Sequence, residues 1–326
     1  MDGIRRLIGE GHYRSVQDFL FAAAHNQLYD LEQTSGAAPA DASITSLSRI
    51  KKSTILAMPS PQYQLLAPDV GEVNTNALPE PDRIGSEIFG LWNRFFPVKI
   101  TTRVLANMLK GDGSSVPLDK LQENASTVAR ELGRMLLRKE RDLGRKRSDM
   151  VATALPTKGG VQAEYKAKAR FKSHFVGFLS KDRIEGAPAT LRFVNIWKGD
   201  SDILVGLTSP GLKFTSLTNP IIDRDDFSSA LSDEERRFLI DHISTELPQE
   251  MKLIRFVIEA VKRGAVHPEA LQEEIKKLKP ELKENELVIA RSGLLGRMSE
   301  LKLVTRTRNG LSVSYKVTPD AELLLS

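Results

Sequence analysis

The chain has 326 residues, with 47 Lys and Arg against 42 Asp and Glu, a formal net charge of +5 and no cysteine. This length predicts two or three domains, because one domain usually holds about 100–200 residues. The lack of cysteine excludes disulfides, thiolate metal sites and a cysteine nucleophile, and is typical of a cytoplasmic protein. No apolar stretch reaches the roughly 18–20 residues of a membrane span. The basic pI of 9.2 favours a polyanionic partner, so the positions of the charges matter.

Residues 1–33 are predicted to form a helical assembly element. Ser15-Val-Gln-Asp18 is a capping box in its Asp form, and apolar residues follow it at helical spacing. The motif GHYRSVQDFLFAAAHNQL, residues 11–28, resembles the two helices of ribbon-helix-helix DNA-binding proteins. That family has a strand before the first helix, and no strand precedes Asp2 here. A dimerising helix pair and a plain helical hairpin therefore both stay open for this element.

Residues 34–84 are rich in Ala, Pro, Ser and Asn and show no sustained hydrophobic period. This composition predicts a flexible linker between the N-terminal element and the rest of the chain.

The remaining sequence carries a weak internal duplication with three matches in the same order. Phe96-Pro97 matches Leu247-Pro248. Further on, Lys172–Ser180 matches Arg291–Ser299, and residues 203–211 match residues 313–321. We therefore expect two related domains, at residues 85–222 and 223–326.

The second copy shows the clearer pattern. A helix capped by Ser232 is followed by one that ends at Gly264, one that begins at Pro268 and one over 284–301. An Asn309-Gly310 turn between two alternating segments then predicts a β-hairpin. Three helices followed by a hairpin is the order of a winged helix-turn-helix.

Residues 291–318, RSGLLGRMSELKLVTRTRNGLSVSYKVT, resemble the recognition helix and wing of winged-helix regulators of the MarR and PadR type. The matching positions are Leu294, Met298, Leu301, Leu303, Val304, Arg306, Tyr315 and Thr318, and Lys302 stands where those families carry Gly. The resemblance implies a mainly α fold with small β-hairpin wings, built as two tandem winged-helix domains.

Such a fold would place a recognition helix in the major groove and a wing on flanking phosphate. Residues 287–318 hold six Lys and Arg against one Glu, whereas residues 223–286 hold 11 bases and 16 acids. The basic side of the second copy is therefore its helix and wing. Its candidate DNA-binding residues are Asn285, Arg291, Ser292, Arg297, Arg306, Arg308, Asn309 and Lys316.

The first copy has the denser charge, with thirteen Lys and Arg against five acids over residues 130–172. Clustered cations that neutralise phosphates give salt-sensitive affinity. The alternative is that the bases near residue 140 only complement a helix C-terminus. The candidate DNA-binding residues are Arg141, Arg145, Lys146, Arg147, Lys166, Lys168, Arg170, Lys172, Ser173 and His174, the last at the start of the expected recognition helix.

No catalytic pattern emerges, because the five histidines are scattered and no phosphate-binding or dinucleotide motif is complete. Asp223-Arg-Asp-Asp226 has the acids of a divalent-ion site, but acids at a helix start are the favoured interpretation. We therefore expect no enzyme activity, no cofactor and no metal.

These observations predict a cytoplasmic, homodimeric protein that binds double-stranded DNA. It would act in transcription regulation, or at a plasmid or mobile-element site in replication or partition. The alternative is a tandem winged-helix subunit that binds a protein partner in a chromosome-organising or defence ATPase complex.

Overall fold

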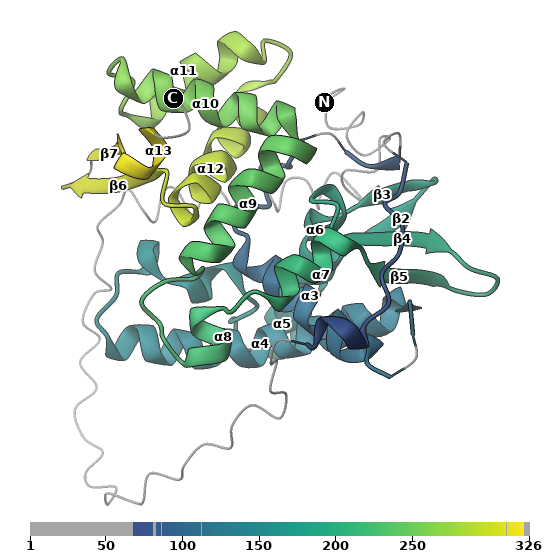
Figure 1. Cartoon of the computed structure of the whole chain (residues 1–326). Helices are drawn as coiled ribbons and strands as arrows, with labels where there is room; N and C mark the ends of the chain where they lie inside the picture. Colours follow the sequence, from purple (N-terminus) through teal and green to yellow (C-terminus); the bar gives the residue numbers. More distant parts are fainter. Residues whose placement is uncertain (1–67, 81–82, 86, 112, 311, 323–326) are drawn as a thin grey trace, which may run out of the picture. The chain divides into compact units, whose positions relative to one another are not determined.

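The computed structural model describes residues 68–80, 83–85, 87–111, 113–310 and 312–322. Its contacts divide the chain into Met1–Gln64 with Asn309–Ser312, and Leu65–Arg308 with Val313–Ser326. The second unit, which holds nearly all described residues, is mainly helical with short antiparallel hairpins (Figure 1). The predicted N-terminal helical element, residues 1–33, lies outside the described residues, as does most of the predicted linker.

We use "first repeat" for residues 96–216 and "second repeat" for residues 248–322. The elements of the first repeat are α3 (Phe96–Leu109), β1 (Val116–Pro117), α4 (Leu118–Asp142), α5 (Val161–Phe171), β2 (Phe178–Ser180), β3 (Arg183–Glu185), α6 (Ala187–Thr190), β4 (Val194–Lys198), β5 (Ile203–Leu207) and α7 (Ser209–Ser216). A π-helical turn, Lys172–Val176, follows α5 directly. Strands β1, β5 and β4 form one antiparallel sheet in that order, and β2 pairs with β3.

Helix α3 is the centre of the first repeat. It is buried on all sides from Phe96 to Ala106 and packs against α4, α7 and β5. A helix that is covered all round must be apolar or have partners for its polar groups. Most buried residues of α3 are apolar, and the buried Lys99 and Arg103 have polar partners in a cluster that is described below.

Helices α8 (Pro220–Arg224) and α9 (Asp233–Glu246) connect the repeats. The second repeat then has α10 (Pro248–Lys262), α11 (Pro268–Leu278), α12 (Glu284–Glu300), β6 (Val304–Asn309), β7 (Ser312–Val317) and α13 (Pro319–Glu322). These bounds confirm the predicted helices and the hairpin. Ser232 and Glu235 form the capping box of α9, and Gly264 has a φ of 103° after α10, as a helix-ending glycine should.

The same helix-to-strand turn occurs once in each repeat. Arg192, between α6 and β4, has a φ of 56°, and Lys302, between α12 and β6, has a φ of 59°. Left-handed backbone is uncommon for residues other than glycine. Its recurrence at positions 110 apart indicates that residues 187–216 and the end of the second repeat share one local fold.

The end of the last strand is also held alike in the two repeats. The amide of Thr208 donates to the carbonyl of Phe193 at 3.1 Å, and the amide of Thr318 donates to that of Leu303 at 3.1 Å. Each threonine precedes a helix, α7 or α13, and its hydroxyl accepts an amide of that helix. The predicted match between residues 203–211 and 313–321 is therefore confirmed.

The first strand of the sheet has a counterpart as well. Val116 of β1 pairs with Val205 of β5. In the second repeat the amide of Tyr315 donates to the carbonyl of Val266 at 2.8 Å, where Tyr315 is the residue 110 positions after Val205. In each repeat, the chain that follows the first helix thus touches the last strand.

The predicted match between Lys172–Ser180 and Arg291–Ser299 is wrong as a structural alignment. The helical run ends at Gly177, which has a φ of 117° and leads into β2, whereas Arg291–Ser299 lies inside α12. When the two repeats are aligned with an offset of 110 residues, the end of α12 corresponds instead to α6. No recognition helix therefore begins at Lys172.

The predicted linker is too long at its C-terminal end. Val73 is buried, the amide of Asn76 donates to the carbonyl of Leu207 at 2.7 Å, and Ile84 bridges to Ile184 of β3. Val73, Asn76 and Ile84 therefore belong to the folded part of the chain and not to a flexible linker.

Candidate nucleic-acid interface

The face of α12 that was predicted to read DNA is covered by the chain's own segment 88–95. A β-carbon at Gly293 would lie 1.9 Å from the carbonyl oxygen of Gly90, and one at Gly296 would lie 2.8 Å from that of Asn93. The small residues of this face do permit a close approach, but the backbone that approaches belongs to the protein. In the structure, the part of α12 around Gly293 and Gly296 therefore faces segment 88–95.

Arg297 is buried in the same contact, with 2% of its surface exposed. It donates to Glu250 Oε1 at 2.6 and 3.0 Å and to the carbonyl of Trp92 at 3.0 Å. Its predicted role in DNA binding is corrected to a structural one. Glu300, one turn further on, accepts the amides of Phe95 and Phe96 and so caps the start of α3. Burial raises the pKa of Glu300, and the charge of Arg94 opposes this effect.

The other candidates on α12 lie nearer its start. Asn285 is exposed in the first turn, and Ser292 is half-buried. Arg291 donates to Gln272 Oε1 of α11 at 2.9 Å. Only the first turn of α12 therefore keeps a fully exposed polar candidate.

The β6–β7 hairpin is basic and largely exposed. Residues 302–317 contain no acid, and Arg308, Asn309 and Lys316 are exposed while Arg306 is half-buried. Thr307 Oγ1 bonds to Ser314 Oγ across the two strands at 2.7 Å. The hairpin thus keeps the surface that the sequence predicts for a wing.

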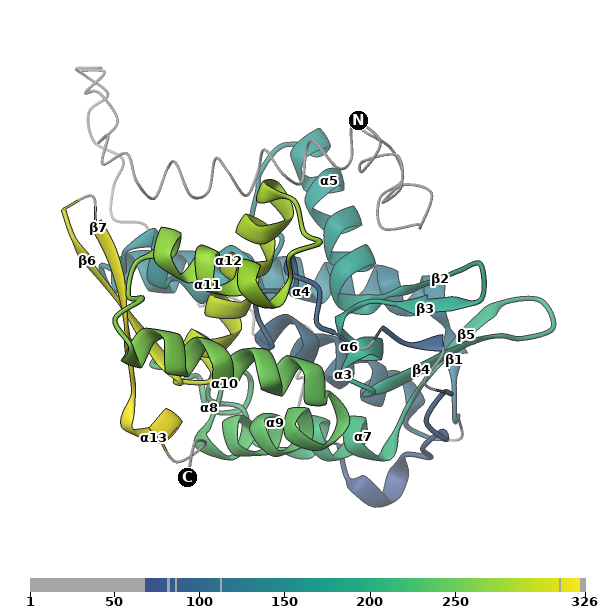
Figure 2. The same cartoon turned by 90° about the horizontal axis from the view of Figure 1, so that it is seen from above.

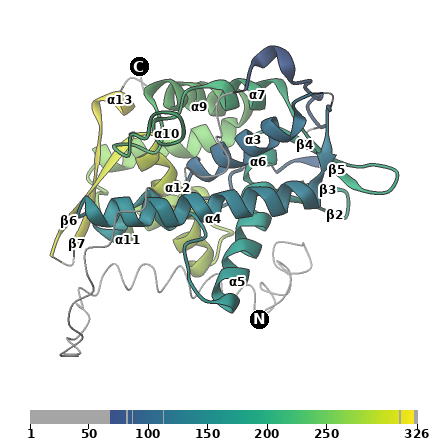
Figure 3. The same cartoon turned by 90° about the horizontal axis from the view of Figure 1, so that it is seen from below.

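The C-terminal end of α4 carries a second exposed group of cations, which includes Arg141, Lys146 and Arg147. In Figures 2 and 3 this end of α4 and the β6–β7 hairpin lie at the same end of the described unit. We call these three residues, together with Arg308 and Lys316, the basic end. It draws on both repeats.

Arg145 has a structural role, which corrects its predicted one. It donates to the buried Glu140 at 2.8 Å and to the carbonyl of Phe227. Glu140 also accepts the amides of Val151 and Ala152 at 2.8 and 3.0 Å. Together, Arg145 and Glu140 close the turn after α4. Arg145 is thus accounted for by contacts within the protein.

The alternating bases after residue 165 fall on two sides of α5 and the π-helical turn. Lys168 Nζ donates to Thr127 Oγ1 of α4 at 3.1 Å and lies 3.8 Å from Glu123, with which Lys172 also forms an ion pair. These two lysines hold α5 against α4, and their DNA contact stays a prediction. Lys166 is exposed and Arg170 half-buried. The run from Lys166 to Arg170 lies within α5.

His174 is also used internally, because Trp92 Nε1 donates to its Nδ1 at 3.0 Å. This bond requires an unprotonated Nδ1. The neighbouring Ser173 is half-buried. Since the helical run ends three residues later, neither residue starts a recognition helix.

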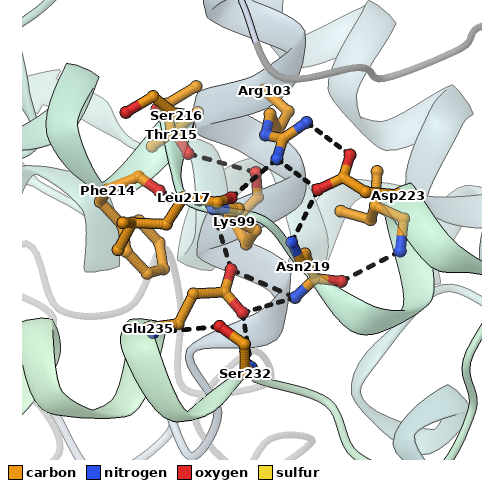
Figure 4. Close-up of polar contacts among 12 residues, drawn as sticks. Lys99, Arg103, Phe214, Thr215, Ser216, Leu217, Asn219, Asp223, Ser232 and Glu235 are labelled. Atoms are coloured by element: carbon orange, nitrogen blue, oxygen red, sulfur yellow. Dashed lines mark hydrogen bonds and ion pairs between the residues drawn. The ribbon is translucent and has the colours of Figure 1, made fainter.

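A cluster of buried polar side chains joins α3 to the chain between α7 and α9 (Figure 4). Lys99 Nζ lies 2.8 Å from Glu235 Oε1 and donates to the carbonyls of Phe214 at 2.5 Å and Leu217 at 2.7 Å. Burial lowers the pKa of Lys99 to about 8, and the Glu235 carboxylate opposes this effect. Three acceptors around one ammonium group indicate a structural joint.

Arg103 completes the cluster by donating to both oxygens of Asp223, at 2.9 and 2.7 Å. Asp226 accepts the amide of Ser228 at 2.8 Å. Two acids of the Asp223–Asp226 run therefore have structural partners. In the part of the chain that the structure describes, no group of three or more His, Asp or Glu could hold a metal ion.

The outer face of α5, with the exposed Tyr165, was missed from the sequence. A helical wheel of residues 161–171 separates the side that carries Tyr165 from the side that carries Lys168 and faces α4.

No protein-family model, curated protein or solved structure matches the chain. None of the helices in the described ranges is long and apolar enough to cross a membrane.

Proposed function

We propose that the chain binds double-stranded DNA and is built from two tandem winged-helix domains. The observation that carries the proposal is the basic end, to which α4 of the first repeat and the β6–β7 hairpin of the second both contribute exposed cations. Cations from two domains on one side suit a long, uniformly charged partner such as the phosphate backbone.

The repeated local structure supports the domain assignment. In each repeat a helix leads through a left-handed residue into a two-stranded hairpin, and the chain after the first helix touches the last strand. A winged helix has a comparable strand arrangement, which supports the proposal. Regulation of transcription, or binding at a plasmid or mobile-element site, is the corresponding role, with a homodimer assembled through the N-terminal element.

Salt-dependent binding to a duplex tests the proposal. The slope of log affinity against log salt is about −0.9 per neutralised phosphate. Replacing Arg141, Lys146 and Lys316 together with Ala should make the slope shallower by roughly 2–3. Fluorescence anisotropy with a labelled duplex measures it.

The matched control is the triple Ala variant of Lys252, Arg255 and Lys262, three exposed cations of α10. Its slope should stay at the wild-type value. Absence of binding at low salt, or equal slopes for the two triple variants, would reject the proposal.

The alternative function, a protein-binding subunit, is favoured by one observation. The face of α12 that would read DNA already holds a protein segment, residues 88–95. A partner protein that copurifies with the chain after nuclease treatment, combined with no affinity for duplex DNA, would support this alternative.

A further inference from the structure

Helix α5 is fastened to α4 along one of its sides. Lys168 and Lys172 contact Glu123 of α4, and Glu164 forms an ion pair with Arg130 of the same helix. Phe171 at the end of α5 is buried. These contacts fix the direction of the helix, which projects from α4 in Figure 2.

The outer side of α5 presents a compact set of exposed side chains. Gln162, Tyr165 and Lys166 are exposed, with 69% of the Tyr165 surface accessible, and Val161 in the first turn is 90% exposed. Positions 162, 165, 166 and 169 lie on one face of a helix. Ala169 is the fourth of these, and its small side chain leaves room for a close approach.

The residues just before α5 are not crowded by other described parts of the chain. Apart from their own chain neighbours, no described atom lies within 4 Å of the place where a β-carbon would stand at Gly159 or Gly160. Recognition helices contact base edges mainly through the residues near their N-termini. Gln162, Tyr165 and Lys166 occupy the first half of α5, so they lie near the end that would enter a groove.

The base of α5 is held rigidly, which a specific contact requires. Gln122 Nε2 of α4 donates to the carbonyl of Gly177 at 2.7 Å, and Thr101 Oγ1 of α3 donates to that of Phe175 at 2.7 Å. Gly177 and Gly186 cross closely beneath the β2–β3 hairpin, since a β-carbon at Gly186 would lie 2.5 Å from Gly177 Cα. The turn after α5 is therefore fixed to both neighbouring helices.

The chemistry of the outer face matches the major-groove edges of base pairs. Gln binds adenine N6 and N7 with two hydrogen bonds, Lys binds guanine O6 and N7, and apolar groups contact the thymine methyl. Gln162, Lys166 and Val161 supply these three kinds of contact. Among the described helices α12 was the other candidate, and its C-terminal half is covered by residues 88–95.

We infer that α5 is the base-reading helix of this chain and that its outer face, Gln162, Tyr165, Lys166 and Ala169, binds the major groove of duplex DNA. The inference rests on the proposed function and deepens it. It assigns sequence preference to the first repeat, while the basic end supplies affinity that does not depend on sequence.

The test is selection of preferred sites from a randomised duplex pool with the full-length protein, followed by affinity measurements on the selected site and a scrambled one. Gln162→Ala and Lys166→Ala should each weaken binding to the selected site on the order of 10-fold. Binding to the scrambled site should change by less than about 3-fold, because at most one phosphate contact is lost. Gln249→Ala and Lys276→Ala, exposed on α10 and α11, are matched controls for the two side chains and should leave both affinities unchanged.

The outcomes separate the two proposals. If the wild type binds DNA but selects no sequence, or if both α5 variants keep the wild-type preference, α5 is not the reading helix and the proposed function stands. The second result would point to a protein partner on the outer face of α5. If the wild type binds no duplex at low salt, the proposed function itself fails, and the inference fails with it.

Discussion

Lys99 and Glu235 are fully buried and lie 2.8 Å apart, although they are 136 positions apart in the sequence. Charges removed from water are stable only where a partner and further hydrogen bonds replace the solvent. Both conditions are met, because Lys99 has two backbone carbonyls and Glu235 has the amides of Asn219 and Ser232 around it. The pair thus joins the central helix of the first repeat to the helix that leads into the second.

Replacing Lys99 with Met should therefore lower the free energy of unfolding by about 3–5 kcal/mol, since Glu235 would stay buried without its partner. The double variant Lys99→Met with Glu235→Gln should lose less than Lys99→Met alone, because the buried charge is removed. Urea unfolding followed by circular dichroism gives these values. Lys262→Met, at an exposed position of α10, is the control, and a loss for Lys99→Met no greater than that of the control would contradict the prediction.

At the scale of single elements, Gly293 and Gly296 show what a sequence pattern can and cannot indicate. Small residues on one face of α12 predict that something approaches closely, and this holds. The pattern does not identify what approaches, because a DNA groove and a backbone segment about 200 residues away both require the same small side chains. Segment 88–95 has no period of its own that would pair it with α12.

The substitution Gly293→Ala tests this contact, because the direction of its effect on stability depends on whether segment 88–95 lies against α12. In the middle of an exposed helix, Gly→Ala normally stabilises by about 1 kcal/mol. Here the new methyl group would meet the Gly90 carbonyl, so we expect a loss of about 1–3 kcal/mol. Gly159→Ala, where nothing lies within 4 Å, should be neutral or slightly stabilising. A gain in stability for Gly293→Ala, measured by thermal unfolding, would show that α12 and segment 88–95 are not in contact.

The helices and the hairpin of the second repeat can be predicted from local sequence signals alone. Pro268, Gly264 and Asn309-Gly310 act through their own backbone preferences, which do not depend on distant residues. The first repeat was harder to predict, because α5, the π-helical turn and the β2–β3 hairpin lie between α4 and α6. The match of Lys172 with Arg291 rested on similar residue types that occupy different structures. The outer face of α5 was hidden by this false alignment.

At the scale of the whole molecule, buried polar contacts join the first repeat and the segment before it to α9 and to the second repeat. Lys99 pairs with Glu235, Glu300 caps α3, and Arg297 of α12 binds both Glu250 and the carbonyl of Trp92. Trp92 in turn donates to His174 of the first repeat. The contacts of Glu300 and Arg297 require the second repeat to be folded, because they satisfy amides at the start of α3 and the carbonyl of Trp92. Two domains with separate cores could unfold separately. Here, buried polar contacts link the two repeats, so we expect the unfolding of one to destabilise the other.

We therefore expect one cooperative unfolding transition for the two repeats, even in a variant with a weakened joint. Arg297→Ala leaves Glu250 buried without its partner and should cost about 3–5 kcal/mol. The midpoints from tryptophan fluorescence, which reports Trp92 and Trp197, and from circular dichroism, which reports all helices, should shift together. Arg263→Ala, which removes an ion pair from a side chain that is 56% exposed, should cost less than about 1 kcal/mol. A second circular dichroism transition in Arg297→Ala, without a fluorescence change, would show instead that the repeats fold independently and that their joint is a contact between autonomous domains.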